Sequence, residues 1–193
     1  MKLRSLVIAL LIAAASATVH AQGAIYINPV AIRVSNSTAD NSNFAFLGKG
    51  QTSRMFYGVA IGGFYDIPTQ HKEVEIGLDL RDEILHGNNA LLNSFLVGPR
   101  ISPTKYERFH PYVEPFVGAG STRAPNTAIR ITKVQYGVFA GLDYDINRHV
   151  DFRVAEIGYS SLSTASAGTI GLTQSIPSST LLSITSGLTF RLP

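Results

Sequence analysis

Apolar and polar residues alternate along most of this chain with a period of two. The clearest segment is Lys72–Ile84, in which apolar residues occupy every second position and only Asp82 interrupts that face. Side chains of a β-strand alternate between two faces, whereas a helix would mix the two sets. The pattern therefore predicts a β-strand here.

The same alternation recurs in seven further segments. Three of them are nearly as regular: Met55–Ile67, Lys133–Ile146 and Thr180–Leu192. Four are weaker: Asn93–Ser102, Tyr112–Ser121, Ala24–Val34, whose phase shifts near Pro29, and Val150–Tyr159, whose phase is lost around Glu156. A phase shift beside a proline predicts a β-bulge at Pro29. The chain is thus expected to form eight strands of about ten residues, with no helical stretch.

Connections between the predicted strands alternate between short and long. Short turns are predicted at Pro68–His71, Pro103–His110 and Asn147–His149, and longer loops, rich in Ser, Thr and Asn, at Ser35–Arg54, Leu85–Ala90, Thr122–Thr132 and Ser160–Ser179. Short turns at one end and longer loops at the other are typical of an outer-membrane barrel. We therefore predict an all-β fold, an eight-stranded antiparallel up-and-down transmembrane β-barrel.

The first 21 residues have the three parts of a secretory signal peptide. A basic start at 1–4 precedes the apolar run 6–15, and Val19-His20-Ala21 matches a cleavage site after Ala21. The apolar run is too short to cross a bilayer as a helix. We expect residues 1–21 to be a signal peptide and residues 22–193 to be one barrel domain, exported to the bacterial outer membrane.

Composition excludes several other classes of protein. With 45% hydrophobic and 15% charged residues the chain is too apolar for intrinsic disorder, and with no Cys it forms neither a disulfide scaffold nor a zinc–thiolate site. Removal of the signal peptide takes away Lys2 and Arg4 and lowers the formal charge from +3 to +1. The charge therefore predicts no nucleic-acid partner.

Charged residues of the predicted strands fall on one face, and the other face is nearly all apolar. The charged face holds eight acids and five bases: Glu73, Glu75, Asp79, Arg81, Glu83, Arg100, Glu114, Lys133, Asp143, Asp145, Asp151, Arg153 and Arg191. A soluble lipocalin-like barrel would turn this face to water, whereas a membrane barrel turns it into the lumen. The similar number of acids and bases favours a closed lumen in which the charges are paired in a structural salt-bridge network.

Two further features favour the membrane barrel. Small residues fit the interior of a narrow barrel, and glycines interrupt the charged face at nine positions: Gly58, Gly62, Gly77, Gly98, Gly118, Gly120, Gly137, Gly141 and Gly187. On the apolar face, Tyr57 and Tyr65 lie eight residues apart, and so do Tyr136 and Tyr144. Eight residues of a tilted strand rise about 20 Å, close to the height of the apolar band that aromatic girdles flank. These four tyrosines are predicted to form such a girdle.

Residues 22–193 resemble the small outer-membrane β-barrels of the OmpA/OmpX type. The resemblance rests on this patterning and on two segments, VDFRVAEIGY (Val150–Tyr159) and LLSITSGLTFRL (Leu181–Leu192). The resemblance implies an integral protein inserted by the barrel-assembly machinery, in contact with outer-membrane lipid and lipopolysaccharide. Barrels of this type usually finish on an aromatic residue, whereas this chain finishes on Pro193. That departure leaves open whether the insertion signal is retained.

Candidate metal sites have simpler explanations. The carboxylates of Glu73, Glu75, Asp79 and Glu83 could bind a hard cation, but they extend along roughly 30 Å of one strand and have arginines as partners. The histidines at the short turns, His71, His110 and His149, belong to strand pairs that a barrel keeps apart. We therefore expect no metal and no cofactor.

Catalytic motifs are absent from the sequence. Some small barrels are lipid-modifying enzymes with a Ser–His pair, but Ser160, Ser161 and Ser163 lie in no G-x-S-x-G motif and have no identifiable base. We expect that the protein is not an enzyme.

An eight-stranded barrel has an interior that side chains fill, so a plugged structural body is expected. Its function would then lie in envelope integrity or in adhesion-like contact with an extracellular partner at the long loops, with the barrel a monomer. Two alternatives stay open. One is a narrow passive channel, which requires mobile lumen charges, and the other is a soluble lipocalin-like binding barrel in the periplasm.

Overall fold

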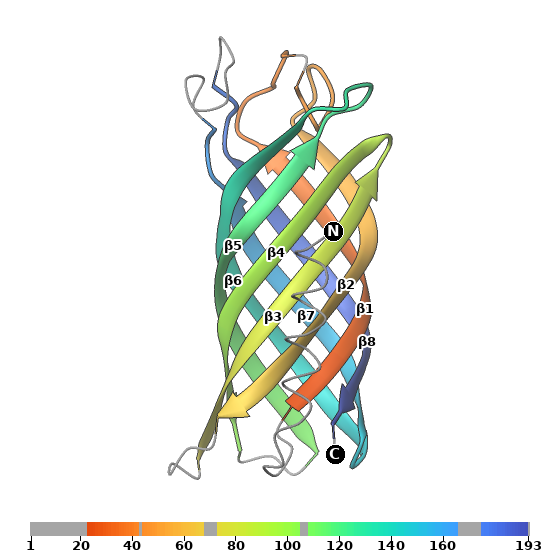
Figure 1. The fold of residues 1–193 in the computed structure, drawn as a ribbon, viewed down its shortest axis with the longest axis vertical. Coiled ribbons are helices and arrows are strands. Elements are labelled where there is room, and N and C mark those ends of the chain that lie inside the picture. The colour runs from red at the N-terminus through yellow and green to blue at the C-terminus, as the bar shows by residue number, and fades with distance from the viewer. Residues whose placement is uncertain (1–22, 43, 68–72, 105–107, 166–174, 193) are drawn as a thin grey trace, which may run out of the picture.

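The computed structural model describes residues 23–42, 44–67, 73–104, 108–165 and 175–192, and the predicted signal peptide lies outside them. Eight β-strands form: β1 (Gly23–Asn36), β2 (Ser53–Ile67), β3 (Val74–Gly87), β4 (Ala90–Pro103), β5 (Phe109–Arg123), β6 (Arg130–Asn147), β7 (Val150–Leu162) and β8 (Ser179–Arg191). Each strand pairs antiparallel with the next, and β8 pairs with β1 to close the barrel (Figure 1). The predicted fold is confirmed.

The two ends of the barrel differ. Three long connections lie at the upper end in Figure 1, here named the loop end, and β8 finishes at the opposite, turn end. At the turn end the first and last strands are tied together, because Leu192 donates its N–H to the carbonyl of Gly23 at 2.8 Å. The longer loop predicted at Leu85–Ala90 is wrong. Instead β3 and β4 continue into a two-residue turn whose Asn88 and Asn89 have φ of 46° and 66°, as a type I′ hairpin requires.

Strand lengths and bulges also differ from the prediction. The strands contain 13 to 18 residues rather than about ten, because they extend beyond the alternating segments from which they were predicted. The bulge predicted at Pro29 is wrong, since β1 pairs with β2 in unbroken register. The inward side chains of β1 change there from polar Tyr26 and Asn28 to apolar Val30 and Ile32, which imitates a change of phase.

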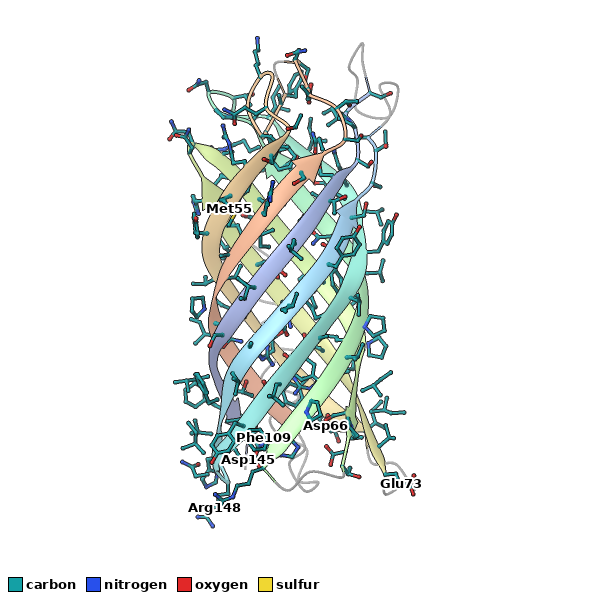
Figure 2. The ribbon with its side chains drawn as sticks, turned by 180° about the vertical axis from the view of Figure 1, so that it is seen from behind. Met55, Asp66, Glu73, Phe109, Asp145 and Arg148 are labelled. Atoms are coloured by element: carbon teal, nitrogen blue, oxygen red, sulfur yellow. The ribbon has the colours of Figure 1, made fainter. Side chains whose placement is uncertain are left out.

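Apolar side chains cover the outer wall. Large hydrophobic residues are exposed on all eight strands, for example Ile25 (49%), Val134 (54%) and Ile184 (58%). Figure 2 shows Met55 on this wall towards the loop end and Phe109 at the turn end. The soluble alternative requires the apolar face to point inward, so this orientation contradicts it. Within the described part of the chain, no helix is long and apolar enough to cross a membrane.

Most charged side chains of the lumen lie in its turn-end half, here named the polar half, and a large apolar cluster lies in its loop-end half, beside the buried polar side chains of Lys133 and Gln135. Towards the loop end, Val30, Ile32, Val34, Phe56, Ala60, Leu85, Ala90, Leu92, Leu162 and Leu181 form one buried cluster. Phe46 and Leu47, from the connection between β1 and β2, join this cluster and cover the opening. The predicted polar interior is therefore interrupted by this apolar cluster. Apolar residues can occupy both faces of a strand wherever the lumen is closed to water.

Candidate functional site

Three buried arginines occupy the polar half of the lumen. Arg81 of β3, Arg100 of β4 and Arg153 of β7 face inward by the alternation of their strands, and their exposed fractions are 1%, 5% and 0%. Because an unpaired buried charge is very costly, each guanidinium must meet carboxylates or hydrogen-bond acceptors inside the barrel.

Two carboxylates hold the three guanidinium groups together. Arg81 donates to both carboxylate oxygens of Glu156 at 2.7 and 2.8 Å, and Arg153 donates to Glu156 at 3.3 Å. Asp143 accepts from Arg100 at 2.7 Å and from Arg153 Nε at 3.0 Å. The bidentate Arg81–Glu156 pair has the geometry of the strongest side-chain ion pairs. Arg153 links the two halves of this network, since it contacts both acids.

Aromatic rings cover the flat faces of the same arginines. The guanidinium of Arg100 lies 3.7 Å from the ring centroid of Tyr112 and 4.1 Å from that of Phe64, and Arg81 lies 3.9 Å from that of Phe139. A guanidinium is planar and weakly hydrated, so it can stack on rings while its edge binds carboxylates. These stacking contacts fill the space that water would otherwise occupy around the charges.

Two tyrosine hydroxyls complete the network. Tyr26 donates to Asp79 at 2.8 Å and accepts from Arg81 Nε at 3.0 Å. Tyr112 donates to Glu156 at 2.5 Å. Neither tyrosine was predicted as a site residue, although both share the inward face of their strands with charged or polar residues.

Glu156 is the central acid of the network and was also missed. The register of β7 shifts between Arg153 and Glu156, so Val154 and Ala155 both face outward and the acid returns to the lumen. The loss of phase around Glu156 in the sequence is the signal of this bulge. Strict alternation from Arg153 would place Glu156 outside, which is why its role could not be deduced from the period alone.

The thirteen predicted lumen residues divide into two groups. Nine are buried: Asp79, Arg81, Glu83, Arg100, Glu114, Lys133, Asp143, Asp151 and Arg153. Of the other four, Glu73 precedes β3 and is exposed, Glu75 is exposed, and Asp145 and Arg191 are 30% and 40% exposed at the turn end. The interior thus holds fewer charges than the pattern predicts.

The remaining buried charges differ in how they relate to the central network. Glu114 belongs to the network, because it lies 3.6 Å from Arg81. Lys133 instead donates to the carbonyl of Pro177 at 2.9 Å, which ties the connection between β7 and β8 to the barrel wall. Glu83 lies where the polar and apolar halves meet, and one of its oxygens has no hydrogen-bond partner among the described residues.

A second, more exposed cluster lies at the turn end. Arg191 contacts Asp151 at 2.7 Å and Asp145 at 3.1 Å, and Asp145 also contacts His110 at 3.0 Å. A cavity of about 380 Å³ opens beside it, lined by Arg108, Tyr144, Asp145, Ile146, Asn147, Arg148 and Arg191. Figure 2 shows Asp145 and Arg148 at this end. His71 lies outside the described residues, and the described part of the chain contains no group of three metal-ligating side chains.

The four tyrosines of the predicted girdle lie on the outward face. Tyr57 and Tyr136 are towards the loop end and are 60% and 53% exposed. Tyr65 and Tyr144 are towards the turn end, where the ring of Tyr144 lies 5.0 Å from that of Phe109.

Glycines leave space for neighbouring strands and for the rings of the network. A Cβ on Gly58 or Gly118 would collide with the backbone carbonyl of the adjacent strand, that of Ile84 or of Phe95. A Cβ on Gly141 would collide with the ring of Tyr112. The glycines thus allow the aromatic rings to reach the arginines.

Side chains fill both halves of the lumen. In the central cluster every arginine is paired and stacked, and the apolar cluster lies on the loop side of it. Charges held in this way have no freedom to accompany a solute.

Comparison with known proteins identifies the fold of the chain and nothing beyond the fold. No protein-family model matches the sequence, and no curated protein matches it. Among solved structures, Neisserial surface protein A superposes with a TM-score of 0.58 at 12% identity, over 89% of this chain and 97% of that one. Ail, the attachment invasion locus protein of Yersinia pestis, superposes with a TM-score of 0.52 at 10% identity, over 90% of this chain and all of that one. The chain therefore has the fold of the small eight-stranded barrels.

Proposed function

We propose that this protein is an integral β-barrel of the bacterial outer membrane, with a plugged lumen and a structural or adhesion-like role at the cell surface. The observation that carries the proposal is the outer wall, where large apolar side chains are exposed on every strand. Such a wall would aggregate in water, whereas lipid provides the apolar surroundings it needs.

The lumen supports a structural role over a channel. Passage through the barrel would have to displace both the apolar cluster and the Arg81–Glu156 and Arg100–Asp143 pairs. Breaking a buried ion pair costs about 3–5 kcal/mol, so spontaneous opening is rare.

Contacts of the described loop-end residues with the barrel support a role in surface contact. Ala165 and Ile176 exchange backbone hydrogen bonds of 3.0 and 2.8 Å, and they pack on Ile131 and Phe44. Phe46 and Leu47 anchor the first connection in the lumen. A loop that is already ordered loses less entropy when it binds a partner.

The names of the structural neighbours agree with this location. One is described as a surface protein and the other as an attachment invasion locus protein. We propose a comparable surface location for this chain, with outer-membrane lipid as its surroundings, an extracellular partner at its loops, and secretion by a signal peptide that is cleaved after Ala21.

Membrane fractionation tests this proposal. The protein should be recovered with the outer membrane, and the folded barrel should migrate differently from the boiled protein on a denaturing gel. Recovery in the soluble periplasm, with no heat-dependent change of migration, would contradict it. Mass spectrometry of the mature N-terminus tests the cleavage, which should leave Gln22 first.

Conductance measurements distinguish the plug from a channel. Purified protein in planar bilayers should give no discrete conductance steps. Reproducible steps from the wild-type protein would favour the passive channel and would show that the lumen charges move.

A further inference from the structure

The loop end of the barrel carries more bases than acids. The connections and strand ends at 36–53, 87–90, 123–130 and 162–179 contain one acid, Asp40, and three bases, Lys49, Arg123 and Arg130. The turn end is mixed, as the Arg191, Asp145 and Asp151 cluster illustrates. Like charges gathered at one end of a barrel repel each other and destabilise the fold. Folding therefore does not explain this excess of bases.

Two of these bases lie directly opposite each other. Arg123, at the end of β5, and Arg130, at the start of β6, are register partners. Residues so paired have Cβ atoms about 5 Å apart, and like charges in this position destabilise a sheet. Neither guanidinium forms an ion pair with a described residue, and the Nε of Arg123 is buried without a hydrogen-bond partner in the described chain. The pair therefore lacks a neutralising group within the protein.

The position of the pair indicates from which side an anion would approach. Along β6, Arg130 lies on the same face as Val134 and Tyr136, which are exposed on the apolar outer wall. Along β5, Arg123 lies on the same face as Val117. Both arginines thus continue the lipid-facing wall beyond its aromatic residues, at the level where lipid headgroups lie.

Other outward bases lie near the same end. Arg33 of β1 faces outward and is exposed, and His86 of β3 faces outward beside the Asn88-Asn89 turn. Among the described residues, Asp82 is the acid on the outward face of the strands, and it lies four residues from His86, towards the middle of β3. No described acid on the wall therefore competes for these bases near the loop end.

We propose that Arg123 and Arg130 form a binding site for a phosphate group of an amphiphilic glycolipid in the outer leaflet, of the lipopolysaccharide type. One phosphate between the two guanidinium groups would accept charge-assisted hydrogen bonds from both and remove their repulsion. The acyl chains of the same lipid would lie on the apolar wall below, over Val134 and Tyr136. The proposal rests on the outer-membrane location and deepens it, since it names the lipid and the residues that bind it.

The test measures binding of diphosphoryl lipid A, and of the same lipid without its phosphates, to the full-length protein in detergent micelles. The wild-type protein should bind the phosphorylated lipid about tenfold more tightly, because hydrogen bonds between charged groups dominate the contact. The double variant R123Q/R130Q should lose this preference. R123K/R130K should keep part of it, since lysine retains the charge but not the bidentate fork. K49Q is the matched control for charge and should bind as the wild type does.

Folding and location are checked in the same samples by the heat-dependent gel shift. If the wild type shows the shift but R123Q/R130Q binds phosphorylated lipid A as well as the wild type does, the site is wrong and the outer-membrane proposal stands. If a sulfated oligosaccharide binds in an Arg123- and Arg130-dependent manner and lipid A does not, the site is for an extracellular polyanion and the lipid proposal fails. If the wild type shows no shift, both proposals fail together.

Discussion

Replacement of Glu156 by Gln provides the sharpest test of the lumen network. Glu156 accepts two hydrogen bonds from Arg81, one from Arg153 and one from Tyr112, and all four residues are buried. The amide of Gln has one acceptor oxygen and no charge, so Arg81 keeps Glu114 at 3.6 Å as its carboxylate partner and Arg153 keeps Asp143, which it shares with Arg100. Loss of one partner from a buried ion pair costs about 3–5 kcal/mol. We expect the free energy of unfolding of Glu156→Gln to fall by about 3 kcal/mol, because Gln keeps part of the hydrogen bonding.

Urea titration in lipid vesicles measures this change. The chain contains no Trp, so unfolding is followed by far-UV circular dichroism and by the heat-dependent gel shift. Glu75→Gln is the matched control, because Glu75 is exposed at the turn end and its change should cost less than about 0.5 kcal/mol. A double variant with Arg81→Met should lose less than the sum of the single changes, since the two residues contact each other. A loss for Glu156→Gln no larger than that for Glu75→Gln would refute the argument that the network stabilises the barrel.

Three further changes test other features of the barrel. Gly118→Val should reduce the folded fraction on the heat-shift gel, because its side chain would collide with the carbonyl of Phe95; Gly23→Ala, whose Cβ has no neighbour closer than 3.5 Å, should not. Asn89→Val should lower the free energy of unfolding in urea by about 1–2 kcal/mol relative to Asn89→Gly, since φ is 66° there, and equal values would contradict the turn assignment. Asp82→Leu should raise that free energy in vesicles by about 1–2 kcal/mol, because the carboxyl group lies on the lipid-facing wall. A decrease would mean that Asp82 has a partner in the membrane.

The buried charged network affects the stability of the barrel differently from an apolar core. Arg81, Arg100 and Arg153 must be desolvated, and the network repays this only when all its contacts form together. A partly formed network is unfavourable, so the network disfavours closure of the barrel in another register. We infer that the network contributes more to the uniqueness of the closed barrel than to its total stability.

Much of the fold could be predicted because membrane barrels follow a local rule. A residue two positions along a strand lies on the same face, so the sequence of Lys72–Ile84 determines which residues face the lumen. Short connections likewise favour antiparallel pairing of successive strands, and this includes the two-residue turn between β3 and β4 where a longer loop was predicted. Nine of the thirteen predicted lumen charges are buried, since they follow this period without interruption.

Properties that depend on several strands at once could not be predicted. The period of two was enough to predict the eight strands, their two faces and the outward position of Tyr57 and Tyr136. The contact between Glu156 and Arg81, 75 positions away, depends on the tertiary structure, because the bulge in β7 and the register of the five strands from β3 to β7 bring the two residues together. The apolar cluster in the loop-end half of the lumen could not be predicted either, because an apolar residue that faces the lumen has the same period along its strand as one that faces lipid. Period is a local property of one strand, whereas contact across a closed barrel depends on the register of every strand in it.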